Sequence, residues 1–420
     1  MRLAYLLALL LTTACQAAGP SLLIRGATIH PVSSPKIENA NLLVVDGKIA
    51  EIGPKVSPPK GARLIDARGL HVYPGMIDSA TEVGLSEISS VRETNDTTEL
   101  GDFKPQLRTV IAVNADSEHI PVIRANGIVA AITLPQGGVI SGQAAFLYLD
   151  GWTWEEMAIR RDVAMVLHFP TFGAGPSRFS AETPPSLAEM RRTYENRVKQ
   201  LQDYLEQARA YQRAKAAPSP EFRPNLAMEA MLPVIEGKLP LLIHASRERS
   251  IRDALSWAQK EKVRVILAGV RKPGNTLAEI KAQGIAVILG PTQALPLEED
   301  DAYDEVYSLP GVLYQAGIKF AFGSFGNQFA RNLPYQAASA VAFGLPYEEA
   351  LKSVTLYPAQ IWGVDSMMGS LEKGKWANLI LTDGDPLEVK TQVKRMFIQG
   401  REVELESKHT RLYQRYSGRP

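Results

Sequence analysis

The pattern of apolar and polar positions differs between the outer and the middle parts of this chain. Short β-type runs broken by turns fill residues 21–77, and the same pattern returns over residues 379–398. Asp46-Gly47 stands between two such runs, which is a strong signal for a β-hairpin. We therefore predict a small β-sandwich built from both chain ends, residues 21–77 and 364–405.

The middle part, residues 78–363, alternates short apolar runs with amphipathic stretches. This alternation is typical of repeated β/α units and a parallel sheet, so the predicted fold class is α/β. About eight such units would close into a TIM (β/α)8 barrel, whose chemistry lies at the C-terminal ends of the strands. A long polar stretch, residues 186–216, predicts a helix that leaves the barrel and is partly exposed, and residues 406–420 form a C-terminal tail. The clearest apolar runs are residues 128–134, 163–167, 241–243, 263–268, 285–289 and 318–322.

The composition says more about the class of binding partner than about the fold. The chain has 420 residues, of which 45% are hydrophobic and 22% charged, which is enough to bury a large core and excludes a disordered protein. Its formal charge is +1, from 46 basic and 45 acidic side chains. Such a balance gives no broad field to hold nucleic acid or an acidic membrane. We therefore expect a small-molecule ligand.

The N-terminus has the pattern of an export signal. Arg2 precedes an apolar run over residues 3–11 and a series of small residues that ends at Ala18, so residues 1–18 are predicted to be a signal peptide. The expected location is the periplasm, after cleavage near Ala18. Cys15, the only cysteine, stands where a bacterial lipobox would place its lipidated residue, although the leucine that this motif normally has three places earlier is missing. A membrane-anchored lipoprotein is therefore the alternative.

The segment Pro74-Gly75-Met76-Ile77-Asp78 resembles the end of the first barrel strand in the amidohydrolase superfamily. In that superfamily Pro-Gly-x-x-Asp is followed by His-x-His, whose two imidazoles bind a divalent metal. Ala80 and Glu82 occupy the two histidine positions here. A methyl group cannot coordinate a metal, and a carboxylate replaces nitrogen by oxygen. One ligand is thus lost and the other is changed.

Six further segments in the same order resemble the imidazolonepropionase-related branch of this superfamily. The resemblance implies a metal-dependent barrel that hydrolyses non-peptide C–N bonds in cyclic amides, imides or related small substrates, beside a β-sandwich. It also implies assembly through the barrel helices, hence a homo-oligomer. The segments are Glu87, residues 92–96, 127–128 followed by 135–138, 238–245, 331–334 and 369–375.

Most of the ligand set that the resemblance implies is missing. The family uses a Lys or Glu on the fourth strand, one His each on the fifth and sixth strands, and a catalytic Asp on the eighth. Only the fifth-strand histidine is found, as His244, because the sixth run ends in Ala268-Gly269 and Phe325 stands where the Asp is expected. Asn327 nearby could supply a neutral oxygen but not a general base.

One other histidine ends an apolar run: His168 follows residues 163–167. If the strands are in the expected register, Glu82, His168 and His244 converge at the barrel mouth. They could hold a single divalent metal, zinc, iron or manganese. Alternatively no metal binds, and Glu82 and His244 form a hydrogen-bonded acid/base pair. In the third interpretation both histidines are structural and the cleft binds without catalysing.

Arginines near the strand ends suggest how a substrate is held. Arg247 follows the His244 strand and Arg331 follows the last strand, so with Asn327 they form a predicted rim suited to a substrate carboxylate. Two functions remain open at this point. One is a hydrolase of non-peptide C–N bonds with His244 and Glu82 as catalytic groups, and the other is a metal-free pseudoenzyme that binds a small ligand or a partner protein.

Overall fold

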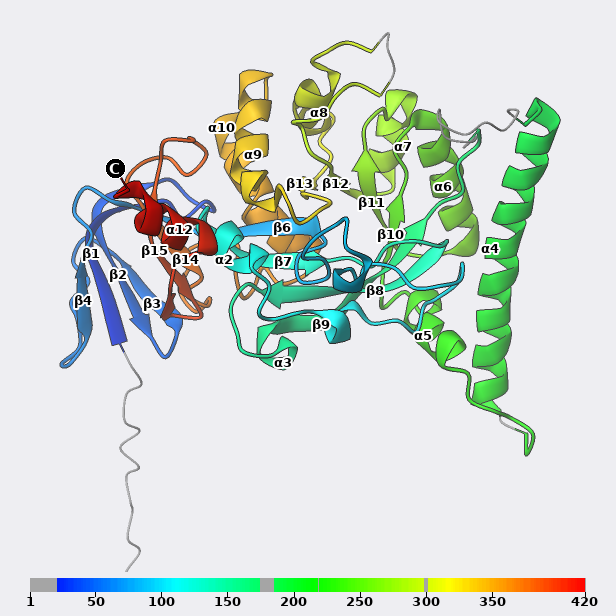
Figure 1. Ribbon diagram of the computed structural model, residues 1–420, viewed down its shortest axis with the longest axis horizontal. Coiled ribbons are helices and arrows are strands. Elements are labelled where there is room, and N and C mark those ends of the chain that lie inside the picture. Colours follow the sequence, from blue (N-terminus) through cyan, green and yellow to red (C-terminus); the bar gives the residue numbers. More distant parts are fainter. Residues whose placement is uncertain (1–20, 174–184, 218, 298–300, 420) are drawn as a thin grey trace, which may run out of the picture.

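The computed structural model describes residues 21–173, 185–217, 219–297 and 301–419, which form two eight-stranded sheets and the helices around them (Figure 1). The predicted signal peptide, residues 1–18 with Cys15, lies outside the described residues. Within the described ranges no helix combines the length and the apolar character that a membrane span requires.

The first sheet joins the two ends of the chain. Its strand order is β16-β15-β14-β5-β1-β2-β3, and β4 pairs with β1. Leu379 of β14 pairs antiparallel with Pro74 of β5, so the C-terminal strands continue the N-terminal sheet. Asp46 and Gly47 both have positive φ, as the predicted hairpin turn between β2 and β3 requires. The strands are β1 Ser21–Ile29, β2 Ile37–Val45, β3 Lys48–Gly53, β4 Arg63–Asp66, β5 His71–Pro74, β14 Leu379–Thr382, β15 Val393–Ile398 and β16 Arg401–Val403.

The second sheet is a nearly closed barrel whose strands follow one another in chain order. The N–H of Phe325, just after β13, donates to the carbonyl of Ala80 in β6 at 2.7 Å, so the last strand returns to the first. The predicted TIM barrel beside a β-sandwich is therefore confirmed. The strands are β6 Met76–Thr81, β7 Ile128–Thr133, β8 Ile140–Tyr148, β9 Ala158–His168, β10 Leu241–His244, β11 Val265–Val270, β12 Ala286–Leu289 and β13 Phe320–Phe322.

One strand of the barrel runs against the others. β8 is antiparallel to both β7 and β9, whereas the remaining neighbours are parallel. Because β8 runs opposite to both of its neighbours, β7 and β9 point in the same direction. The C-terminal ends of β6, β7 and β9 to β13 therefore lie at the same end of the barrel. The catalytic end expected of this fold is thus preserved.

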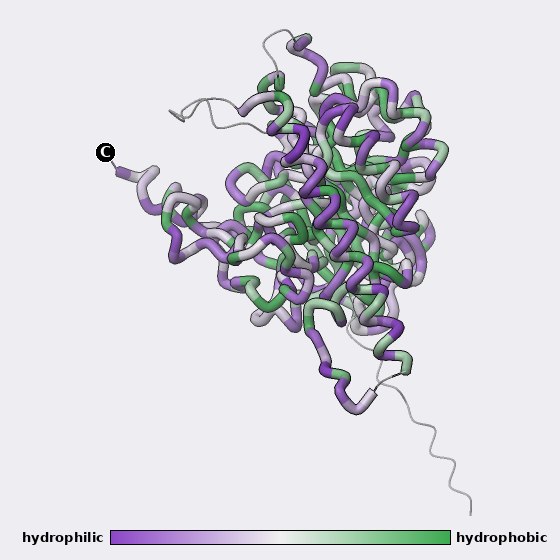
Figure 2. The backbone as a smooth tube through the Cα atoms, turned by 90° about the vertical axis from the view of Figure 1, so that its right-hand side faces the viewer, coloured by the Kyte–Doolittle hydropathy of each residue, from purple (hydrophilic) through white to green (hydrophobic). Residues whose placement is uncertain are grey.

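Helices cover the outside of the barrel, and one of them stands apart. α4 begins after Ser186, whose side chain forms a capping box with Glu189. Only Leu201, Leu205 and Ala208 of α4 are buried, which confirms the predicted long, partly exposed helix. Figure 2 shows this helix in mostly hydrophilic colours in front of the hydrophobic sheet. The helices are α1 Thr109–Ala112, α2 His119–Arg124, α3 Trp154–Met157, α4 Leu187–Ala216, α5 Leu226–Ile235, α6 Glu248–Glu261, α7 Leu277–Ala282, α8 Glu305–Gln315, α9 Leu333–Ala342, α10 Tyr347–Ser353, α11 Leu356–Ile361 and α12 Lys408–Ser417.

Candidate functional site

His168 and His244 lie side by side at the catalytic end of the barrel. They are the last residues of β9 and β10, and the parallel register pairs them with each other. Their imidazole rings stack with centroids 4.4 Å apart and an angle of 25° between the ring planes. The structure thus brings together the two histidines that the sequence placed at strand ends.

Both imidazoles carry a buried nitrogen that has no hydrogen-bond partner, Nε2 in each case. Burial, and to a smaller extent the neighbouring His168, together lower the pKa of His244 to about 3. Burial also lowers the pKa of His168, with a smaller contribution from Lys104. Both rings are therefore neutral near pH 7. A buried polar group left unpaired costs roughly 1–3 kcal/mol, which a ligand that supplies the partner would recover.

Lys104 is a charged group of this site that the sequence did not reveal. It is 3% exposed, and its ammonium group donates to the carbonyl of Glu99 at 2.7 Å. Its backbone N–H donates to the carbonyl of Ile140 at 2.8 Å, which fixes the loop against β8. Burial lowers the pKa of Lys104. No sequence pattern marks this lysine, because its position depends on the loop folding back on a strand that follows it.

Glu82 follows β6 at the same end of the barrel, and its side chain is partly exposed. Burial raises the pKa of its carboxyl group. In the described ranges no hydrogen bond joins Glu82 to His244, whose Nε2 has no partner at all. The structure therefore does not form the expected acid/base pair; His168, not Glu82, is the neighbour of His244.

Ala80 and Phe325 occupy the positions where the resemblance implies a histidine and an aspartate. Ala80 is 0% exposed, and a Cβ added at Gly323 would lie 2.7 Å from its Cβ, so β6 and β13 leave no space for an imidazole. Phe325 has a left-handed backbone with φ of 52°, and its ring meets the His244 ring edge-on with centroids 5.7 Å apart. An aromatic ring thus covers one side of His244.

The divalent metal that the resemblance implies does not fit these residues. In the part of the chain that the structure describes, no group of three or more His, Cys, Asp or Glu side chains could hold a metal ion. The expected convergence of Glu82, His168 and His244 on one metal is thus corrected: only the two histidines come together. Two imidazoles alone fall short of the three protein ligands that catalytic zinc sites use.

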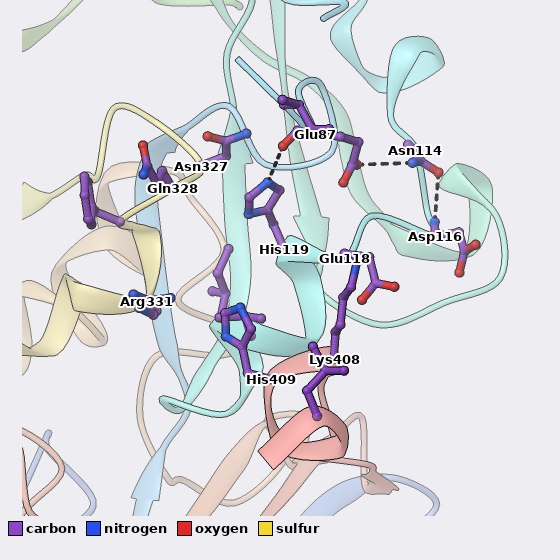
Figure 3. A pocket seen from close by; sticks show the side chains of 15 residues that line it. Glu87, Asn114, Asp116, Glu118, His119, Asn327, Gln328, Arg331, Lys408 and His409 are labelled. Carbon is purple, nitrogen blue, oxygen red and sulfur yellow. Dashed lines mark hydrogen bonds between the residues drawn. The ribbon is translucent and has the colours of Figure 1, made fainter. Parts of the chain in front are cut away.

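Of the three residues predicted to form the substrate rim, two line the same cavity and one does not. Arg331 and Asn327 line an open cavity of about 800 Å³ beside the barrel end, shown in Figure 3. Asn327 is 8% exposed, and its amide donates to the carbonyl of Ser86 at 2.5 Å, so it supports the loop after β6. Arg247 instead precedes α6, where its backbone exchanges hydrogen bonds with the Ser250 hydroxyl. It is not among the residues that line this cavity.

Comparisons with known proteins give one family and one architecture. The profile of the amidohydrolase family matches residues 158–403. Amidohydrolase tasK of Hapsidospora irregularis is 23% identical over 430 residues, which cover 91% of this chain and 43% of tasK. The chain thus spans less than half the length of this relative. A dihydroorotase of Pelotomaculum thermopropionicum is 46% identical over 57 residues, which are 14% of this chain and 13% of that enzyme.

A solved structure supports the fold. The crystal structure of an amidohydrolase from Thermotoga maritima superposes with a TM-score of 0.80 at 22% identity, covering 91% of this chain and 99% of that one. At this identity the likeness concerns the fold alone.

Proposed function

We propose, from the premise that this chain belongs to the amidohydrolase family, that it acts on non-peptide C–N bonds of a small cyclic amide or a related compound. Relatives in the family are named for hydrolysis of such bonds, the dihydroorotase among them. The site of the reaction in this proposal is the barrel end at His168 and His244. We also propose that the chain belongs to the imidazolonepropionase-related branch of this family, because of the segments that resemble that branch.

The observation that carries the proposal is the pair of unpaired Nε2 atoms. A neutral imidazole nitrogen donates or accepts a hydrogen bond according to its tautomer. A cyclic amide presents an N–H donor and a carbonyl acceptor in one small ring. His168 and His244 could therefore bind both edges of such a ring, one as donor and one as acceptor, and both buried nitrogens would be satisfied.

Two further groups would supply the chemistry. Negative charge develops on the carbonyl oxygen as water attacks, and the nearby ammonium group of Lys104 would stabilise that charge in a desolvated site. We assign the proton transfer to Glu82, which lies at the same end of the barrel and whose carboxyl pKa is raised by burial. It would take a proton from the attacking water and pass it to the leaving amide nitrogen as the C–N bond breaks. No step of this mechanism needs a metal. Because most residues that would hold one are missing, we propose that the metal centre of this chain is degenerate.

The test is a ring-opening assay with dihydroorotate and hydantoin as probes. We expect turnover by the intact protein and its loss in His244→Gln, with Lys104→Gln reducing kcat more than KM. Turnover that is unchanged in His244→Gln would reject this site.

A second candidate function is binding without turnover. It is favoured by Phe325, which stands where the resemblance implies the catalytic aspartate and whose ring, edge-on to His244, cannot act as a base. In this case hydantoin would bind, be recovered unchanged, and lose affinity in His244→Gln. The same assay, followed by analysis of the ligand after incubation, separates the two candidates.

We also propose export of the chain, on the pattern of residues 1–18. Mass spectrometry of the protein from a secreting host would test it. A mature N-terminus near residue 18 supports ordinary cleavage, a lipid on Cys15 supports the anchored form, and an intact Met1 contradicts both.

A further inference from the structure

The cavity lined by Arg331 and Asn327 lies away from the histidine pair and carries both cationic and acidic side chains. It is about 800 Å³ in volume and is bordered by the loop after β6, by α2, by the short 3-10 helix η3 (Ala330–Asn332) and by α12 (Figure 3). Neither His168 nor His244 lines it. Its volume is in the range of small-molecule sites, roughly 300–1,000 Å³.

Two cationic side chains line the cavity at separate places: Arg331 lies at η3, and Lys408 lies beside Glu118 in Figure 3. In the described ranges neither cation forms an ion pair with a carboxylate, and Glu118 pairs with Arg411 at 3.9 Å. The backbone carbonyl of Arg331 accepts a hydrogen bond from the Asn126 amide at 2.8 Å, so η3 is held in place. A guanidinium group binds a carboxylate through two parallel hydrogen bonds. Arg331 is therefore available to a carboxylate from outside the protein.

Acidic side chains lie across the cavity from Arg331. Glu87 and Asp116 line it above and to the right of Arg331 in Figure 3. The Asn114 amide donates to Glu87 Oε1 at 3.2 Å, and the His119 ring donates to the Glu87 backbone carbonyl at 2.9 Å. The carboxylate and the backbone of Glu87 are thus both held in place. No cation of the described chain forms an ion pair with Glu87 or Asp116. These carboxylates are available to an ammonium group.

We propose that this cavity binds a zwitterionic ligand of the amino-acid or short-peptide class. The ligand carboxylate would lie against Arg331 and its ammonium group against Glu87 and Asp116. Val122, Ile123 and Leu412 line the same cavity and would contact the apolar part of the ligand. A purely anionic ligand would leave the charges of Glu87 and Asp116 uncompensated, and a purely cationic ligand would leave that of Arg331 uncompensated. The cavity therefore favours a ligand that carries both charges. The site is separate from the proposed C–N hydrolase centre.

The test is calorimetric titration of the whole protein with the dipeptide Ala-Leu and with two blocked forms, N-acetyl-Ala-Leu and Ala-Leu amide. We expect the zwitterion to bind at least about tenfold more tightly than either blocked form, a difference of roughly 1.4 kcal/mol. Arg331→Gln lowers the affinity for Ala-Leu by a similar factor and leaves the affinity for the amide unchanged. Glu87→Gln has the corresponding effect and spares the N-acetyl form.

Two controls locate the binding. Arg192→Gln, on the exposed surface of α4, leaves all three affinities unchanged. His244→Gln also leaves Ala-Leu binding unchanged, which separates this cavity from the histidine pair. Equal affinity for the zwitterion and its blocked forms would overturn the proposal, as would the absence of binding at millimolar dipeptide or a loss of binding in His244→Gln.

Discussion

The Asp78 carboxylate accepts a hydrogen bond from the backbone N–H of Ser324 at 3.0 Å, which ties the first barrel strand to the turn after the last one. The N–H of Ala80 donates to the same oxygen at 3.2 Å, whereas the other oxygen is buried without a partner. Burial raises the pKa of Asp78 to about 7, against the smaller, opposite effect of these hydrogen bonds. We therefore expect the closed barrel to become less stable when Asp78 ionises.

Asp78→Asn should stabilise the protein at alkaline pH. The folded pKa is raised above the ordinary value of 3.8, so the folded state binds more protons and stability falls as pH rises from about 4 to 7. Asparagine keeps the acceptor oxygen and removes the charge. We expect a higher free energy of unfolding than wild type at pH 8, by at most about 4 kcal/mol, and a small difference at pH 4. Urea unfolding at both pH values measures it.

The control for this prediction is Asp365→Asn, at an exposed aspartate of the same chain. It should leave the pH dependence as in wild type. A difference between Asp78→Asn and wild type that is the same at pH 4 and pH 8 would contradict the account of Asp78.

In His244→Gln, the free energy of unfolding should fall less steeply in acid than in the wild-type protein. The folded pKa of His244 is about 3, below the ordinary value of 6.5, so the unfolded state binds the proton first. This contribution to stability is complete above pH 6.5 and is lost as pH falls from 6.5 towards 3. Its slope is at most about 1.4 kcal/mol per pH unit. Unfolding free energies between pH 4 and 7 should therefore change less steeply in the variant.

His409→Gln, on the exposed face of α12, serves as the matched control and should keep the wild-type slope. Identical slopes for wild type and His244→Gln would show that His244 is not held neutral.

Ala80→His should fail to restore a metal ligand. The fully buried methyl group of Ala80 faces Gly323, where even a single added carbon would lie 2.7 Å away. Overpacking of this kind typically costs about 1–3 kcal/mol. We expect a lower free energy of unfolding and no gain in bound zinc, measured by urea unfolding and elemental analysis. Ala112→His, on the exposed side of α1, should be neutral. Stoichiometric zinc in Ala80→His with unchanged stability would contradict the steric argument.

The fold and one pair of site residues could be predicted from sequence because both depend on local patterns. Apolar runs marked the barrel strands, and the runs that end in His168 and His244 placed both rings at the catalytic end. Their stacking then follows from the pairing of adjacent parallel strands. The sandwich from both chain ends was likewise predicted from the recurrence of one pattern.

The remaining features depend on contacts between distant segments. β8, Ile140–Tyr148, is buried along its whole length, so its sequence carries no alternation that would reveal its direction. Lys104 reaches the site only through the loop that packs on β8. Glu82 and His244 share an end of the barrel, but side-chain positions across a barrel are set by the packing between them, which the spacing of motifs does not specify.

We propose that the His168–His244 pair binds its substrate and turns it over without a metal. The most direct measurement is the rate of hydantoin ring opening by chelator-treated protein, compared with His244→Gln treated in the same way. We expect turnover by the wild-type protein to survive the chelator and to be abolished in the variant. Turnover that disappears with the chelator and returns with added zinc would contradict it.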